Sequence, residues 1–226
     1  MTTSRRAQEK DCLLANPSEE PVSSEKETGQ FDNASFWDER YRTNIALGSG
    51  AGSRGDFLQL KRDLLQQLVA RVQPQSILDV GCGDIEVTRE IAFPGSYLGI
   101  DTSPYVIERN REIRPDWDFL AGDFLALSRA EPIEADLVLC LDVLIHQHEP
   151  DTYRSFVQQL LRSSRKALLV NGFSAFPRSG RLSPNVAFHE PLLETLQSFG
   201  VTNFEILEDF RRTSIILVDL RARPAG

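Results

Sequence analysis

Two glycines directly follow a short apolar segment in the sequence Ile77-Leu-Asp-Val-Gly-Cys-Gly-Asp84. Glycine has no Cβ, so Gly81 and Gly83 would let the backbone approach a ligand closely, although two glycines alone also fit a plain left-handed turn. A dinucleotide-binding turn has the spacing G-x-G-x-x-G, whereas this chain carries Glu86 at the third position, where a carboxylate would repel a pyrophosphate. The segment therefore predicts a site for a cofactor that has no phosphate at this turn.

Two more carboxylates follow the next apolar segments. Asp101 ends Tyr97-Leu-Gly-Ile-Asp101, close to the offset of roughly 20 residues from the first strand at which an acid binds ribose hydroxyls. Asp123 lies in Gly122-Asp-Phe124, where capping of a following helix is the alternative role. Because the carboxyl ends of parallel strands meet at one edge of a sheet, Asp79, Asp101 and Asp123 together suit a ligand with a ribose, an amino group and a positive charge.

His146 follows a further apolar segment at the same predicted edge and could accept a proton from a hydroxyl group. A structural or substrate-orienting role is the alternative. His146, His148 and Glu149 are also metal-ligating residue types, but neighbouring loop residues alone rarely complete a closed coordination shell, so we expect no metal.

Strand and helix patterns alternate along the chain, which favours one doubly wound α/β domain over residues 31–226. Residues 1–30 lack a periodic apolar pattern, and we expect them to form a disordered tail. The expected strands are Ser76–Val80, 96–100, 116–120, Ala135–Cys140, 166–170, 204–208 and 214–218, and the expected helices are 35–41, 56–72, 86–92, 104–114, 151–164 and 191–200. The last two strands are joined too closely for a crossover helix, so the mostly parallel seven-stranded sheet should end in an antiparallel hairpin.

Composition excludes several classes of protein. The 226 residues include 33 acidic and 25 basic side chains, for a net charge of −8, which argues against a nucleic-acid-binding surface. No apolar stretch approaches the roughly 20 residues that span a membrane. The odd set Cys12, Cys82 and Cys140 contains no CxxC, which indicates reduced thiols and a cytoplasmic location. The sequence gives no oligomeric state.

The motifs resemble those of the class I S-adenosylmethionine-dependent methyltransferases. The resemblance covers residues 36–221 and rests on Asp79-Val-Gly-Cys-Gly83, Gly99-Ile-Asp101, Gly122-Asp-Phe124 and the segment from Ala135 to His146. One departure stands out, because Ile85 replaces the usual third glycine of the family motif.

The resemblance implies S-adenosylmethionine as the cofactor and assigns roles to individual residues. Asp101 would bind the ribose, Asp123 the adenine amino group, and Arg54 with Ser53 the cofactor carboxylate. Leu141 and Asp142 would lie beneath the sulfonium. The full implied set of cofactor-binding residues is Asp79, Gly81, Cys82, Gly83, Asp101, Thr102, Asp123, Phe124, Leu141, Arg54, Trp37 and Tyr41, with His146 and Asp142 as catalytic residues.

The sequence thus favours a methyltransferase that acts on a hydroxyl or amine of a small molecule or glycan. One alternative is a catalytically degenerate methyltransferase-like fold that only binds a ligand or partner, for which Ile85 gives weak support. An NAD-dependent oxidoreductase is disfavoured by Glu86 and by the missing third glycine.

Overall fold

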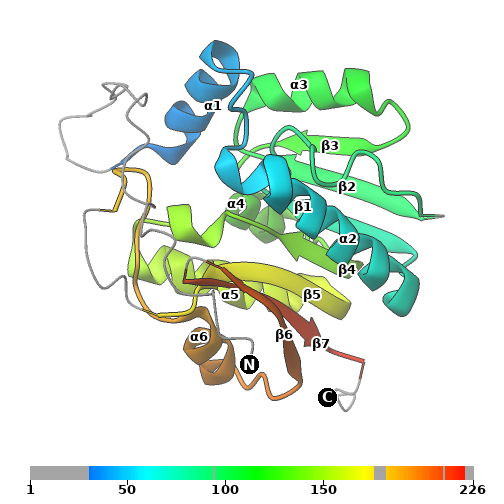
Figure 1. Cartoon of the computed structure of the whole chain (residues 1–226), viewed down its shortest axis with the longest axis vertical. Coiled ribbons are helices and arrows are strands. Elements are labelled where there is room, and N and C mark those ends of the chain that lie inside the picture. Colours follow the sequence, from blue (N-terminus) through cyan, green and yellow to red (C-terminus); the bar gives the residue numbers. More distant parts are fainter. Residues whose placement is uncertain (1–30, 94, 176–181, 211, 222–226) are drawn as a thin grey trace, which may run out of the picture.

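A computed structural model of the chain describes residues 31–93, 95–175, 182–210 and 212–221. Seven strands form one sheet in the order β3-β2-β1-β4-β5-β7-β6 (Figure 1). The strands are β1 (Ser76–Val80), β2 (Ser96–Asp101), β3 (Asp118–Ala121), β4 (Ala135–Cys140), β5 (Ser164–Phe173), β6 (Phe204–Phe210) and β7 (Thr213–Asp219). The first five strands are parallel to one another, and β7 pairs antiparallel with both β5 and β6. The predicted sheet and its terminal hairpin are confirmed.

Helices cover both faces of this sheet. They are α1 (Asn33–Thr43), α2 (Gly55–Val72), α3 (Pro104–Ile113), α4 (Phe124–Ala130), α5 (Pro150–Ser163) and α6 (Leu192–Ser198), with short 3₁₀ turns η1 (Ala51–Ser53) and η2 (Leu144–His146). Successive side chains of β4 point to opposite faces of the sheet. Val138 and Cys140 pack in the core beneath α4, α5 and α6, and Leu137 and Leu139 pack beneath α2 and α3. Strands buried on both faces explain the continuous apolar runs in the sequence.

The expected helix over residues 86–92 does not form, and a series of turns connects β1 to β2 instead. Side chains from distant elements bind two carbonyl groups of these turns, and one of them, that of Glu86, would accept from residue 90 in a helix. Arg62 donates to the Glu86 carbonyl at 3.0 and 2.7 Å, and Arg114 donates to the Arg89 carbonyl at 2.6 Å. The backbone of Ile85, just before these turns, has a positive φ of 51°, outside the right-handed helical region.

Two smaller features differ from the sequence prediction. Helix α1 begins at Asn33, before the expected start at residue 35, and is capped by Asp32, whose carboxylate accepts from the Ser35 amide at 3.2 Å. Helix α4 was not predicted, although its capping residue Asp123 was considered for that role. The predicted tail, residues 1–30, lies outside the described residues. Among the helices described, none is long and apolar enough to cross a membrane.

Candidate active site

A cavity of about 340 Å³ opens at the carboxyl edge of the parallel strands. The chain runs from β1 outward to β2 and β3 on one side and to β4 and β5 on the other, so this edge contains the switch point where ligands bind in open α/β sheets. Residues that directly follow four strands line the cavity: Gly81 and Cys82 after β1, Thr102 after β2, Asp123 after β3, and Leu141, Asp142 and Val143 after β4.

Asp101 holds the glycine turn in place. Its carboxylate accepts from the Gly83 amide at 3.0 Å and from the Ser103 amide at 2.9 Å. The backbone φ angles of Gly81 and Gly83 are 72° and 54°, a region that side chains other than glycine rarely adopt. Burial raises the pKa of Asp101 to about 6, although the backbone donors oppose the shift. Asp101 and the glycine turn therefore form one hydrogen-bonded unit, and the contact of Asp101 with a ribose stays a prediction.

Asp79 lies behind the same turn. The Tyr97 hydroxyl donates to its carboxylate at 2.6 Å, and burial raises its pKa to about 6. Asp79 and Asp101 are thus two buried carboxylates held by neutral donors, at the wall of one cavity. Such an arrangement favours a ligand that brings positive charge or hydroxyl donors to them.

Ile85 occupies the position of the missing third glycine without entering the cavity. Its backbone keeps the left-handed conformation that a glycine would adopt, and its side chain is 1% exposed in the core beneath α2 and α3. The side chain is not among the residues that line the cavity. The departure from the family motif therefore leaves the binding space open.

Asp142 belongs to a buried network that sequence reasoning missed. Lys61 of α2, only 4% exposed, forms an ion pair with the Asp142 carboxylate, and the Asn171 side chain of β5 donates to it at 2.6 Å. Burial alone would raise the pKa of Asp142, but the Lys61 charge and these hydrogen bonds hold it below its usual value. Lys61 resembles an ordinary helix-surface lysine in the sequence, and nothing local relates it to residue 142.

His146 is 9% exposed and lies at the cavity in η2. Its Nδ1 donates to the Asn185 carbonyl, since a carbonyl oxygen can only accept, so Nε2 is the nitrogen with a lone pair. Burial lowers the pKa of His146 to about 4, which keeps the imidazole neutral at physiological pH. A neutral, buried imidazole with a fixed tautomer is able to accept a proton at Nε2.

Helix α1 covers the cavity with aromatic side chains. Trp37 lies edge-on to His146, with ring centroids 4.9 Å apart, and Tyr41 is 4% exposed. Phe31, just before the helix, also lines the cavity and stacks on His148 at 4.6 Å. Trp37 and Tyr41 thus lie on a helix beside the cavity, and Phe31 joins them on its wall; their predicted contact with a cofactor stays a prediction.

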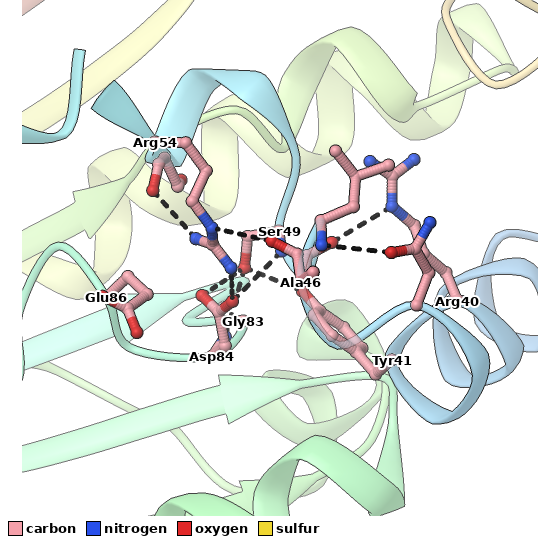
Figure 2. A network of polar contacts seen from close by, with 12 residues as sticks. Arg40, Tyr41, Ala46, Ser49, Arg54, Gly83, Asp84 and Glu86 are labelled. Atoms are coloured by element: carbon pink, nitrogen blue, oxygen red, sulfur yellow. Dashed lines mark hydrogen bonds and ion pairs between the residues drawn. The ribbon is translucent and has the colours of Figure 1, made fainter. Parts of the chain in front are cut away.

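The segment between α1 and α2 is tied to the glycine turn, as Figure 2 shows. Ser49 donates to the Asp84 carboxylate at 2.8 Å through its hydroxyl, and Arg54 donates to the same carboxylate at 2.5 Å. Arg54 does not line the cavity, and its carboxylate partner is Asp84 rather than an open position for a ligand. The predicted contact of Arg54 with a cofactor carboxylate thus has no support in the observed positions.

The remaining predicted site residues are close to the cavity. Asp123 caps α4 by accepting from the Ala126 amide at 2.7 Å, as the alternative role required, and it also lines the cavity. Gly83 contributes through its bond to Asp101 rather than through the cavity wall. Every other predicted site residue is on the wall: Asp79, Gly81, Cys82, Asp101, Thr102, Phe124, Leu141, Trp37, Tyr41, Asp142 and His146. Among the described residues, no three His, Cys, Asp or Glu side chains are grouped to hold a metal ion.

One known family model matches part of the chain. Residues 77–167, which contain the glycine turn, Asp101, Asp123 and His146, match the family model described as a methyltransferase domain. This match and the seven-stranded sheet support an S-adenosylmethionine-dependent methyltransferase with the class I fold, in line with the resemblance noted in the sequence.

Solved structures of low sequence identity share the fold. Magnesium protoporphyrin IX methyltransferase from Synechocystis PCC 6803, crystallised with S-adenosylhomocysteine, aligns with a TM-score of 0.59 at 17% identity, over 83% of this chain and 100% of that one. The N-terminal domain of EvdMO1, crystallised with S-adenosylhomocysteine and D-fucose, gives 0.55 at 16% identity, over 71% and 83%. An O-methyltransferase family protein from Burkholderia thailandensis gives 0.52 at 16% identity, over 72% and 58%. No curated protein sequence matches the chain.

Proposed function

We propose that this methyltransferase transfers the methyl group of S-adenosylmethionine to a hydroxyl or amine of an acceptor that is a small molecule or a glycan. The observation that carries the proposal is the buried Asp101 carboxylate, joined to the glycine turn on the wall of a cavity at the carboxyl edge of the sheet. When bound, the cofactor supplies an already activated methyl group. The chain's residues must then bind, align and remove a proton.

The residues of the cavity suit this cofactor. Asp101 would accept from the ribose hydroxyls, Asp123 and Phe124 would border the adenine, and Gly81 would border the methionine part. Seven carboxylates line the cavity, namely Asp32, Asp79, Asp84, Glu86, Asp101, Asp123 and Asp142, whereas no lysine or arginine is among the lining residues described. Arg54, Arg62 and Lys61, which do not line the cavity, form ion pairs with Asp84, Glu86 and Asp142, so the carboxylates of the wall still outnumber these cationic partners. A site with this charge pattern attracts a sulfonium cation.

His146 would act as the proton acceptor for a hydroxyl nucleophile. Its Nε2 has the lone pair, because Nδ1 donates to the Asn185 carbonyl. The Asp142 carboxylate favours the protonated imidazole, although burial disfavours it more strongly. The positive charge that leaves the donor sulfur as its methyl group departs would therefore reappear on His146, and the net charge of the cavity would stay constant.

The same charge pattern restricts the acceptor. Although Asp84, Glu86 and Asp142 form ion pairs, an anionic group would enter a cavity whose wall has seven carboxylates and, among the described residues, no lysine or arginine, so its binding costs free energy through like-charge repulsion. We therefore favour acceptors without a negative charge. Structural neighbours crystallised with D-fucose, or described as an O-methyltransferase, support a neutral hydroxyl compound. A cytoplasmic location and the absence of a nucleic-acid partner stay predictions from composition.

Matched acceptors test this proposal. D-fucose and D-galacturonic acid have the same ring configuration as galactose. C6 is a methyl group in D-fucose and a carboxylate in D-galacturonic acid. We expect transfer of labelled methyl from S-adenosylmethionine to neutral members of a panel of such pairs and little transfer to their anionic partners. Preferential methylation of the anionic members would contradict the assignment of the acceptor class. Cofactor binding without transfer to any acceptor would favour the degenerate binding protein.

A further inference from the structure

Lys61 is a charged residue buried at a point where the proposed chemistry gives it no role. It lies on α2 between the glycine-rich segment and the sheet, and its side chain is 4% exposed. Its Nζ donates to the Gly52 carbonyl at 2.7 Å and forms the ion pair with Asp142. Burying an ammonium group costs free energy unless the group is fully paired, so the two specific acceptors of this nitrogen indicate a specific role for Lys61 in the site.

The Asp142 side of this pair is rigid. Its amide donates to the Asn171 side-chain oxygen at 2.5 Å, and its carboxylate accepts from the Asn171 nitrogen at 2.6 Å. Asn171 is 3% exposed within β5. The Asp142 backbone has a φ of 60°, so the turn after β4 is held in a sparsely populated conformation by these contacts. Asp142 is therefore a fixed point on the cavity wall.

The other acceptor of Lys61 belongs to the segment that covers the glycine turn. The Gly52 backbone packs directly on the Asp142 carboxylate, because a Cβ at position 52 would overlap it. Ser49 and Ser53, from the same segment, line the cavity. The segment's second attachment is the Asp84 carboxylate, which binds Ser49 and Arg54 at the glycine turn (Figure 2).

We propose that Lys61 is a positioning residue, which fastens the 47–54 segment to the cavity wall at Asp142 and so completes the cofactor site. One ammonium group bonds the segment and the wall together, so ordering of the segment and the charge state of Asp142 are coupled. This role rests on the proposed binding of S-adenosylmethionine in the cavity. Without Lys61, the segment loses its link to the wall and Asp142 keeps an uncompensated negative charge beside it.

Two substitutions remove this connection by different means. Lys61→Met keeps the length and apolar packing of the side chain but removes the ammonium. Gly52→Ala keeps every charge but places a Cβ against the Asp142 carboxylate, so the segment and that carboxylate must move apart. Lys166→Met is the matched control, because it removes a lysine that pairs with Asp136 at the opposite end of the sheet.

Hydrogen exchange and calorimetry give the two measurements. We expect amides of residues 47–54 to exchange at least about tenfold faster in Lys61→Met and Gly52→Ala, while β4 and β5 keep their protection. We expect S-adenosylhomocysteine to bind both variants roughly 5- to 150-fold more weakly, the usual range of coupling between sites, with Lys166→Met unchanged.

The possible outcomes separate this role from simpler ones. A purely structural lysine would raise exchange throughout the domain and leave affinity unchanged well below the melting temperature, which would overturn the proposal. Wild-type exchange at 47–54 in both variants would also overturn it. If wild-type protein does not bind S-adenosylhomocysteine, the proposed function fails, whereas faster local exchange in both variants still supports the link between Lys61 and the segment. If Lys61→Met does not fold, Gly52→Ala decides the question.

Discussion

The low pKa of His146 predicts an unusual pH dependence of methyl transfer. Burial lowers this pKa from 6.5 to about 4. At pH 5.5, a histidine with the ordinary pKa would be about 9% neutral, whereas His146 would stay about 97% neutral. If His146 is the proton acceptor, kcat at saturating cofactor and acceptor should therefore be nearly constant from pH 7.5 down to 5.5 and fall only near pH 4.

A variant tests whether His146 causes this behaviour. In His146→Asn, the amide nitrogen can still donate to the Asn185 carbonyl as Nδ1 does, while the acceptor nitrogen Nε2 is lost. We expect kcat to fall about 10²-fold, the lower end of the range for a positioned base, because an imidazole of low pKa is a weak base. Affinity for S-adenosylhomocysteine should be unchanged. His189→Asn, a histidine outside the cavity wall, is the control.

A pH–rate profile on a hydroxyl acceptor decides the matter. A wild-type kcat that already falls tenfold between pH 7 and 5.5 would contradict the neutral, buried imidazole. Equal rates for wild type and His146→Asn at every pH would contradict the role as a base. The second result would leave alignment of the acceptor as the main source of catalysis.

Three further perturbations follow from the structure. Ile85→Gly should lower the free energy of unfolding, measured by urea denaturation, by about 1–4 kcal/mol. The buried side chain that is lost contributes more than the roughly 1–2 kcal/mol of left-handed strain that is relieved, and a stabilised variant would refute this. Tyr97→Phe removes the hydroxyl that donates to Asp79 and should raise the pKa of Asp79 further. The loss in free energy of unfolding should therefore be greatest at pH 7 and shrink below pH 6, and a pH-independent loss would refute the charge argument. Removing residues 1–30 should change the melting temperature by about one degree at most, and a larger change would show that this segment contributes to the fold.

Sequence patterns located the strands well because burial on both faces leaves a continuous apolar signal, as in β1 and β4. The helix expected at 86–92 does not form, and the Glu86 carbonyl that it would use internally accepts from Arg62, a residue from elsewhere in the chain. Such long-range donors leave no trace in local periodicity.

The candidate site was predictable where it lies on strand ends. Asp101 and Asp123 follow their strands directly, so their common edge could be inferred from the order of elements. Lys61 could not be found in this way, because its partner Asp142 is 81 residues away in the chain. The Asp84 carboxylate that holds Arg54 was equally invisible, since only the folded 47–54 segment brings the two together.

The most direct test of the cofactor site is calorimetric titration of S-adenosylhomocysteine into wild type, Asp101→Ala and the control Asp118→Ala, an exposed acid at the far end of β3. Loss of hydrogen bonds from ribose hydroxyls to the Asp101 carboxylate should weaken binding about tenfold to several hundredfold. The control should bind as wild type does, and NAD should bind none of the three. Equal affinity of wild type and Asp101→Ala for S-adenosylhomocysteine would contradict the placement of the cofactor at this edge of the sheet.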